Sequence, residues 1–319
     1  MKRILITGAS GFIGGFLVQE ALKRQCEVWA GIRKGSDVSG LADPRIHLID
    51  LAYNDKGKLV EQLAEQKENF GAWDYVIHNA GVTKTRNKAD FLRINAGYTA
   101  ALVEALVEAR CVPSKFLLMS SLSCVDSDTC YGASKQAAEE VLRVQKDFPY
   151  VILRPTGVYG PGEKDYFLGI KAVQGGLNVL AGFTPQRITF IYVEDLAVAA
   201  FLALESEKAR SCAYAVADGD VYRDDEYTRL IQEILGKKHV LTLRMPLFIT
   251  RIACFFSEMI GRCLGRSMTL NTDKYKILRR RDWTCDTQPL RDDLGFVARF
   301  PLRLGLKKTI DWYFSQGWL

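Results

Sequence analysis

Short apolar runs alternate with amphipathic stretches through the first half of the chain. The apolar runs predict strands at residues 3–7, 27–32, 46–50, 75–79, 116–121 and 151–154. Between them, apolar residues recur every three or four positions and predict helices at 12–25, 58–68, 91–110 and 131–146. Nearly continuous apolar strands that alternate with helices are typical of a parallel sheet covered on both faces. The sequence therefore predicts an α/β fold with a doubly wound, Rossmann-type parallel sheet.

The pattern loosens after Gly160, where glycines interrupt shorter and more mixed segments. A strand and a helix within residues 188–205 are expected to return to the sheet, and no internal repeat is visible. We expect a nucleotide-binding domain over 1–160 together with 188–205, and a smaller mixed α/β substrate lobe over 161–187 and 206–319.

The first strand ends in three glycines, Gly8, Gly11 and Gly14, and a helical pattern follows at once. A strand, a glycine turn and a helix in that order build a dinucleotide-phosphate site, because the backbone approaches the pyrophosphate and the helix N-terminus offers free N–H groups. The alternative is a plain glycine turn. The expected cofactor contacts in this turn are Gly8, Ser10, Gly11, Phe12, Ile13 and Gly14.

Composition narrows the class of protein. The 319 residues are 48% hydrophobic and 25% charged, which is typical of a globular chain. The formal net charge is +6, and its densest run, residues 279–281, is expected to be a solvated helix end and not a nucleic-acid surface. Eight scattered cysteines without a C-x-x-C pair, and an N-terminus that enters the first strand directly, predict free thiols and a cytoplasmic location. The three histidines are widely separated, so no metal site is expected.

Residues 245–266 form the most apolar long stretch outside the strands. Arg251, Glu258 and Arg262 interrupt it, so it is not expected to span a bilayer. The pattern predicts an amphipathic helix packed on the core or over a substrate pocket. The alternative is peripheral membrane contact, which would involve Phe255 and Phe256.

Tyr131 and Lys135 open a predicted helix ten residues after Ser121, which ends a strand. Their i,i+4 spacing places the phenol and the ammonium group on one helical face. Because a phenol has a pKa of about 10, a neighbouring ammonium and a nicotinamide cation are expected to favour the tyrosinate. Tyr131 would then exchange a proton while a nicotinamide exchanges a hydride, with Ser121 bonded to the same substrate oxygen. The alternative is a packed tyrosine and a surface lysine.

The end of the second strand bears on the choice of cofactor. It carries no carboxylate for the ribose hydroxyls, and Arg33 and Lys34 follow it. A guanidinium binds a 2′-phosphate well, whereas a carboxylate would repel it. We therefore expect NADP, with NAD bound through backbone contacts as the alternative.

Together these motifs resemble the extended branch of the short-chain dehydrogenase/reductase superfamily, which contains nucleotide-sugar epimerases, dehydratases and dihydroflavonol- or sterol-type reductases. The resemblance covers essentially the whole chain and implies a catalytic set of Ser121, Tyr131, Lys135 and Asn95. It also implies a homodimer that pairs through the helices predicted at 91–110 and 131–146. The further cofactor contacts that it implies are Asp50, Leu51, Asn79, Ala80, Gly81, Tyr131, Lys135, Pro155, Thr156 and Gly157.

The leading hypothesis is an NAD(P)-dependent oxidoreductase that acts on a small-molecule substrate, at a secondary alcohol or ketone. The alternatives are a nucleotide-sugar epimerase with tightly bound NAD and a non-catalytic NADP sensor. Leu122-Ser123 stands where resembling sugar dehydratases carry Asp-Glu, which disfavours dehydration. The smaller lobe shows no clear diphosphate signature; its candidates are Arg187, Arg223 and Arg281.

Overall fold

The computed structural model describes residues 1–125, 128–265 and 268–319, apart from the side chain of Arg262. The chain forms two compact units. The first comprises Met1–Pro155, Leu196–Ala215 and Gln288–Phe296, and the second comprises Thr156–Asp195, Val216–Thr287 and Val297–Leu319.

A seven-stranded sheet forms the centre of the first unit, in the order β11-β6-β5-β4-β1-β2-β3. The neighbours from β3 to β6 pair in parallel, so the carboxyl ends of these strands meet at one edge. The order 3-2-1-4-5-6 is that of a Rossmann fold, which confirms the predicted fold class. The strands are β1 (Arg3–Thr7), β2 (Glu27–Gly31), β3 (Ile46–Ile49), β4 (Tyr75–His78), β5 (Lys115–Met119), β6 (Tyr150–Pro155) and β11 (Cys212–Val216).

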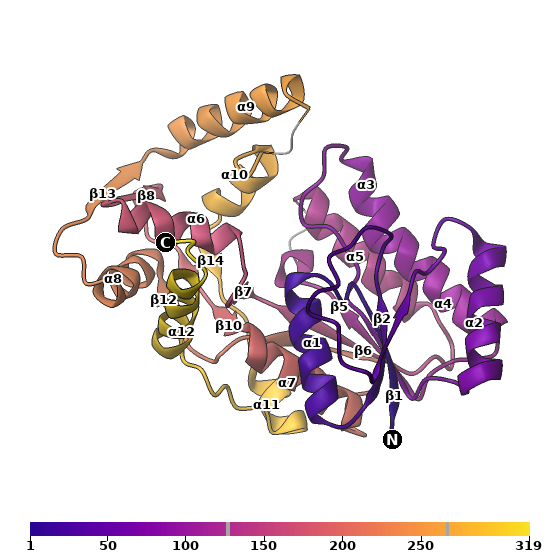
Figure 1. The fold of residues 1–319 in the computed structure, drawn as a ribbon. Helices are drawn as coiled ribbons and strands as arrows, with labels where there is room; N and C mark the ends of the chain where they lie inside the picture. Colours follow the sequence, from indigo (N-terminus) through magenta and orange to yellow (C-terminus); the bar gives the residue numbers. More distant parts are fainter. Residues whose placement is uncertain (126–127, 266–267) are drawn as a thin grey trace. The chain divides into compact units, whose positions relative to one another are not determined.

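Helices cover both faces of this sheet (Figure 1). One face carries α2 (Lys56–Phe70), α4 (Tyr98–Glu108) and α5 (Cys130–Arg143), which contact one another in that order. Side chains cap two of them, because Asp55 accepts from the Lys58 amide at the start of α2 and Thr129 accepts from the Gly132 amide at the start of α5. The other face carries α1 (Phe12–Lys23) and α7 (Val193–Glu205).

The core of the first unit lies between the sheet and the layer of α2, α4 and α5. Its buried apolar side chains include Leu5, Val76, Leu106, Phe116 and Leu142. Nearly every residue of the central strands is buried, as expected for a sheet covered on both faces. This packing holds the carboxyl ends of β1, β4 and β5 in fixed relative positions.

The second unit has a separate core rich in aromatic side chains, including Tyr159, Phe190, Tyr192 and Tyr313. Its helices are α6 (Asp165–Gln174), α8 (Asp224–Ile234), α9 (Leu247–Cys263), α10 (Thr272–Arg279) and α12 (Leu302–Ser315). Its strands are β7 (Gly157–Tyr159), β8 (Leu177–Ala181), β9 (Arg187–Ile188), β10 (Phe190–Tyr192), β12 (Tyr222–Arg223), β13 (Leu241–Met245) and β14 (Asp282–Trp283). Within the described ranges, every helix is too short or too polar to cross a bilayer.

The unit boundaries differ from those expected from the sequence. Residues 206–215 belong to the first unit because β11 joins the large sheet. The helix α11 (Gln288–Leu294) also belongs there, and the Asp293 carboxylate accepts from the Tyr214 hydroxyl on β11 at 2.9 Å. Residues 188–195 belong largely to the second unit, since β10 pairs with β7.

A buried carboxylate anchors the last segment of the second unit. Asp195 is fully buried and accepts backbone N–H groups from Arg299 at 3.0 Å and Phe300 at 2.9 Å. The Arg299 side chain adds a bond of 3.2 Å but is 55% exposed. The Asp195 carboxylate is therefore the acceptor that satisfies the backbone N–H groups of Arg299 and Phe300.

We expect Asp195→Ala to lower the free energy of unfolding by about 2–4 kcal/mol, because two buried N–H groups lose their acceptor. Arg299→Ala should cost less than about 1 kcal/mol, since its exposed ion pair contributes little. Urea unfolding of both variants measures the difference. Equal losses in the two variants would contradict this assignment.

Candidate active site

The turn between β1 and α1 brings backbone segments unusually close. Gly8 has φ of +66°, a conformation that glycine adopts without strain. A Cβ on Gly14 would lie 2.0 Å from the Gly8 carbonyl oxygen, and a Cβ on Gly8 would lie 3.0 Å from the Ala80 Cα. Gly11 precedes α1 and offers no side-chain cap to the first N–H groups of the helix. These residues form a cradle that fits the phosphates of a dinucleotide.

The Thr7 hydroxyl joins this turn to the end of β4. It accepts the backbone N–H groups of Asn79 at 3.1 Å and Ala80 at 3.0 Å. It also hydrogen-bonds His78 Nδ1 at 2.9 Å. Burial, reinforced by the charge of Lys135, lowers the pKa of His78 to about 3 and keeps its ring neutral. The predicted cofactor residues Asn79 and Ala80 thus lie beside Gly8.

Gly81, Asn95 and Lys135 converge at the next position. A Cβ on Gly81 would lie 2.9 Å from Asn95 Oδ1 and 3.3 Å from Lys135 Nζ. The Asn95 carboxamide accepts from the Val82 amide at 2.8 Å and donates to the Ser134 hydroxyl at 2.8 Å. Three predicted site residues from distant parts of the sequence therefore lie together.

The helix predicted at 91–110 is not continuous. Its first part is α3 (Ala89–Phe91), followed by a π-helical turn (Leu92–Gly97) and then α4. Buried Asn95 lies within the wide turn. π-Helical turns are rare overall, but those that occur are often found at functional sites. The departure from a regular helix therefore occurs at a predicted catalytic residue.

Ser121 follows β5, and Tyr131 lies at the start of α5, where the Ser121 hydroxyl acts to lower the pKa of the Tyr131 phenol. Burial raises the pKa of Tyr131 to about 12, and the Ser121 hydroxyl offsets only part of this effect. This differs from the expectation that Lys135 would favour the tyrosinate, because desolvation dominates around the phenol. Tyr131 is therefore protonated at neutral pH and suited to donate a proton.

Lys135 lies one turn after Tyr131 and is buried. Its ammonium group donates to the Met119 carbonyl oxygen at 2.8 Å. Burial lowers its pKa to about 8, although the charges of Cys124 and Glu139 act in the opposite direction. The lysine is thus a site cation and not a surface residue.

Glu139 is a buried residue beside this group that the sequence did not indicate as part of the candidate site. It lies one further turn along α5, is fully buried, and accepts from the Ser120 hydroxyl at 2.6 Å. Arg154 of β6 donates to both of its oxygens, at 2.9 and 2.6 Å. Burial by itself raises the pKa of Glu139, but the hydrogen bonds from Arg154, Cys124 and Ser120 together outweigh it and leave the pKa below its usual value. The signal in the sequence was a carboxylate at i+8 from Tyr131, on the same helical face.

The remaining predicted cofactor residues in the first unit lie at the ends of β2 and β3. Arg33 and Lys34 are exposed, and within the described ranges neither side chain has an ion-pair partner. The Arg33 amide donates to the Ser36 hydroxyl at 3.2 Å, which shapes the turn. Asp50 is exposed directly after β3, whereas the Leu51 side chain packs in the core.

Pro155 ends β6 in the first unit, and Thr156 and Gly157 open the second unit. The Thr156 amide donates to the Val216 carbonyl oxygen at 3.1 Å. The cofactor contacts assigned to these three residues stay predictions.

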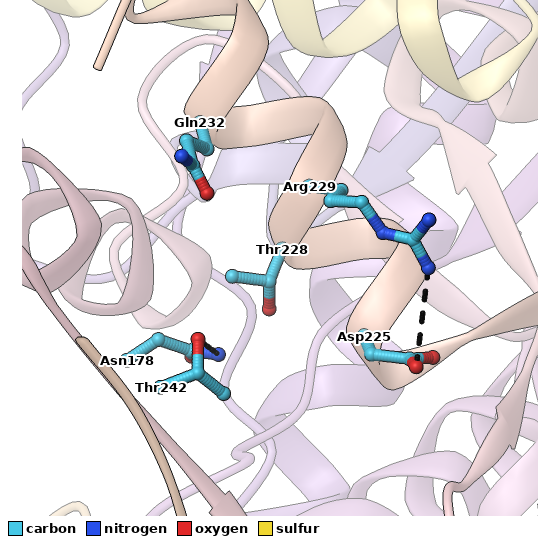
Figure 2. A pocket seen from close by; sticks show the side chains of 6 residues that line it. All are labelled: Asn178, Asp225, Thr228, Arg229, Gln232 and Thr242. Atoms are coloured by element: carbon cyan, nitrogen blue, oxygen red, sulfur yellow. Dashed lines mark hydrogen bonds and ion pairs between the residues drawn. The ribbon is translucent and has the colours of Figure 1, made fainter. Parts of the chain in front are cut away.

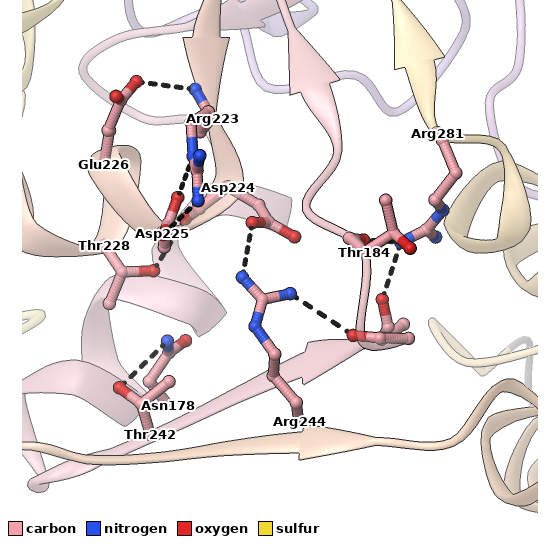
Figure 3. Close-up of polar contacts among 12 residues, drawn as sticks. Asn178, Thr184, Arg223, Asp224, Asp225, Glu226, Thr228, Thr242, Arg244 and Arg281 are labelled. Carbon is pink, nitrogen blue, oxygen red and sulfur yellow. Dashed lines mark hydrogen bonds and ion pairs between the residues drawn. The ribbon is translucent and has the colours of Figure 1, made fainter.

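The three arginines considered for a diphosphate have partners within the second unit. Arg187 pairs with Asp282 at 3.1 Å, and Arg223 pairs with Asp225 at 2.9 Å. Arg281 donates to the backbone carbonyl oxygens of Ala181 and Thr184, both at 2.8 Å; Figure 3 shows Arg223 and Arg281 with their partners. These contacts occupy the groups that a nucleotide-sugar diphosphate would need.

A small polar pocket of about 140 Å³ lies between α8 and the strand pair β8–β13. Figure 2 shows its lining side chains. They are Asn178, Asp225, Thr228, Arg229, Gln232 and Thr242. None of the site residues predicted from the sequence lines this pocket.

The Rossmann-type sheet, the glycine cradle and the grouping of Ser121, Tyr131 and Lys135 define an extended short-chain dehydrogenase/reductase. The model of the NAD dependent epimerase/dehydratase family matches residues 4–217. The chain belongs to this family and is an enzyme of its NAD-dependent class.

Similar proteins carry several different activities. A ceramide reductase of Caulobacter vibrioides is 28% identical over 320 residues, which cover 99% of this chain and 96% of that protein. The UDP-glucose 4-epimerase of Thermotoga maritima has a similar structure, with a TM-score of 0.75, 18% identity and coverage of 98% and 99% of the two chains. The WbmG enzyme of Bordetella bronchiseptica, solved with NAD, has a TM-score of 0.75, 19% identity and coverage of 99% and 94%. Because the two solved structures are only 18% and 19% identical to this chain, their similarity shows that the fold is shared and no more.

We expect the buried charge of Lys135 to cost stability below pH 8. Its pKa of about 8 lies below the usual 10.5, so the folded protein carries a penalty of about 3 kcal/mol at pH 7. The unfolded chain binds more protons between pH 8 and about 10.5, so the penalty disappears over that window. The stability of Lys135→Met relative to the parent should therefore fall as pH rises from 7 to 10.

Urea unfolding at several pH values measures this trend. Tyr131→Phe is the control and should show a nearly flat difference below pH 10, since the Tyr131 pKa lies above that range. A flat difference for Lys135→Met as well would show that the lysine is not desolvated.

Proposed function

We propose that this enzyme is an NADP-dependent oxidoreductase that transfers a hydride between the nicotinamide and a secondary alcohol or ketone. The observation that carries the proposal is the half-buried, protonated Tyr131, whose pKa responds to the Ser121 hydroxyl and which shares a helical face with the buried Lys135. The proposed site joins this group to Asn95 and Gly81 on one side and to the glycine cradle through Asn79 and Ala80 on the other.

The cradle of Gly8, Gly11 and Gly14 fits a dinucleotide, because only glycine at positions 8 and 14 lets these backbone segments approach so closely in the turn before α1. A bound nicotinamide cofactor supplies hydride chemistry. In ketone reduction, the Ser121 and Tyr131 hydroxyls bind the substrate oxygen, and Tyr131 transfers its proton to that oxygen. An alkoxide is a much stronger base than a phenolate, so a phenol with a pKa of about 12 still gives up its proton readily.

Lys135 and Asn95 act around this transfer. The Lys135 ammonium lies among Met119, Gly81 and Asn95, where its charge stabilises the phenolate left by proton donation. Asn95 is held by Val82 and Ser134 and positions the loop after β4. Ser120 and Arg154 hold Glu139, which keeps α5 aligned with the ends of β5 and β6.

The proposed preference for NADP is supported by the end of β2. The strand ends at Gly31 without a carboxylate, and exposed Arg33 and Lys34 follow in a turn. Two exposed cations can bind a 2′-phosphate at little desolvation cost.

A nucleotide-sugar epimerase with tightly bound NAD is the second candidate, because the family and several structural neighbours include such enzymes. The internal partners of Arg187, Arg223 and Arg281 argue against it. A sensor without turnover is a third candidate, which the retained Tyr131 and Lys135 disfavour.

The relative from Caulobacter vibrioides is named for the reduction of a ceramide, so lipid ketones are the first substrate class to screen. We further propose a cytoplasmic homodimer that pairs through α4 and α5. The exposed Val107 and Val144, at the ends of these helices, are available for such contact. A light-scattering mass of one chain would exclude the dimer.

We expect Tyr131→Phe to lower kcat by at least 100-fold on any reduced substrate, because the proton donor is lost. The affinity for NADPH should change less than threefold. Steady-state kinetics and fluorescence titration measure the two effects, with Tyr98→Phe as the control. A loss in kcat below tenfold would contradict the role of Tyr131.

We expect Arg33→Ala to weaken NADPH binding by about 10- to 100-fold, which corresponds to one lost charge-assisted phosphate contact. NADH binding should change less than threefold, since NADH lacks the 2′-phosphate. Titration of both cofactors measures the ratio, and the equally exposed Arg210→Ala serves as the control. An unchanged ratio for Arg33→Ala would favour NAD.

A further inference from the structure

The helix α9 has its apolar face outward. Thr250, Cys254 and Gly261 form its buried stripe at a spacing of about one turn or two, and Glu258 beside them accepts from the Thr272 hydroxyl at 2.6 Å. Seven larger apolar side chains of the helix are each between 38% and 65% exposed. They are Phe248, Ile249, Ile252, Phe255, Phe256, Met259 and Ile260.

This arrangement contradicts the expectation that the apolar face packs on the core, whereas the expectation that the helix lies over a substrate pocket stays a prediction. Small or polar residues make the inner contacts, and the aromatic residues point away from them. The side chain of Arg262, one of the charges considered in that prediction, lies outside the described residues. Monomeric proteins rarely expose contiguous apolar surfaces of this kind without a binding partner.

The strand pair β8–β13 also exposes apolar side chains on one face. Its second strand, β13, directly precedes α9 in the chain. Leu177 pairs in register with Leu241, and Val179 with Leu243, and all four side chains are exposed. Side chains alternate across a strand, so the intervening Asn178 and Thr242 point to the other face, where Figure 2 shows them lining the polar pocket.

Arg244 continues the polar face of this strand pair. Its guanidinium donates to Asp224 at 3.0 Å and to the Gly182 carbonyl oxygen at 3.2 Å (Figure 3). The outer apolar face of β8–β13 ends at Met245, and α9 begins two residues later at Leu247. The strand pair β8–β13 and the helix α9 therefore each expose apolar side chains on one face and carry polar side chains on the other.

Positive charge accompanies this apolar surface. Residues 247–281 contain eight Lys and Arg against two acidic residues, so the segment carries +6, the net charge of the whole chain. The rest of the chain is electrically balanced. Arg251 is exposed on α9, and α10, which contacts α9, carries Lys274, Lys276 and Arg279.

The combined charge and polarity identify the kind of partner. An amphipathic helix with aromatic residues on one face and basic residues beside it is typical of binding to an anionic lipid surface, parallel to the interface. A second copy of the same face would bring two segments of +6 together, which charge repulsion opposes. A lipid bilayer provides both the apolar medium and the negative charge.

We propose that the second unit binds an anionic membrane through the outward face of α9 and the outer face of β8–β13, with Arg251 and the basic residues of α10 at the headgroups. The helix lies in the interface and does not cross the bilayer. The inference does not depend on the proposed reaction.

Vesicle flotation of the full chain tests the proposal. We expect the parent protein to bind vesicles of 30% phosphatidylserine in phosphatidylcholine at least tenfold more than pure phosphatidylcholine. Binding should fall when NaCl is raised to 0.5 M, because the electrostatic part is screened. No binding to either vesicle would overturn the proposal.

Two double substitutions, the paired variants, separate the apolar from the electrostatic contribution to vesicle binding. Phe255→Ser with Phe256→Ser should lower binding at least tenfold, and Arg251→Gln with Lys276→Gln should remove the preference for the anionic vesicles. Phe314→Ser, an exposed phenylalanine on α12, is the matched control and should bind as the parent does. Arg251, Phe255 and Phe256 are exposed and Lys276 is half-buried, so thermal unfolding should stay within a few degrees of the parent. Unchanged binding in both paired variants would also overturn the proposal.

Light scattering tests the competing occupant. A dimer of the parent that becomes a monomer in the Phe255→Ser/Phe256→Ser variant would show that a second copy covers the face, and would overturn the membrane assignment. A mass that is the same in the parent and in this variant supports it when vesicle binding is lost.

Discussion

Two buried charges on one face of α5 hold the site of the first unit together. Lys135 binds the Met119 carbonyl oxygen at the end of β5, and one turn later Glu139 binds Ser120 on the same strand end and Arg154 on β6. Buried ions are costly unless each is paired and hydrogen-bonded. Because the partners lie on the strand ends, α5 has one favourable position, and that position presents Tyr131 to Ser121.

The same burial shifts two pKa values in opposite directions and so defines the chemistry. Desolvation raises the pKa of Tyr131 to about 12 and lowers that of Lys135 to about 8. Both shifts favour the neutral form of the group. At neutral pH Tyr131 is protonated, as ketone reduction requires, whereas Lys135 with a pKa of about 8 still carries most of its charge. In the second unit, by contrast, α9 and β8–β13 expose apolar side chains on one face and carry polar side chains on the other.

The strand pattern and the glycine spacing predicted the sheet because both depend on local sequence. The π-helical turn at Asn95 and the role of Glu139 depend on contacts with Val82, Ser120 and Arg154, which lie far away in the sequence. The sequence also did not predict which face of α9 is exposed. An amphipathic pattern shows that a helix has two faces but not which face meets the core. The sign of the Tyr131 shift required the degree of burial, which i,i+4 spacing does not provide.

The central claim is that the first unit binds a nicotinamide dinucleotide for net hydride transfer. The most direct measurement identifies the nucleotide that the purified protein retains and compares its affinities for NADPH and NADH. The account predicts exchangeable binding with tighter affinity for NADPH. Tightly retained NAD would contradict the proposed reductase and favour an epimerase, and no binding of either nucleotide would contradict the site built on Gly8, Gly11 and Gly14.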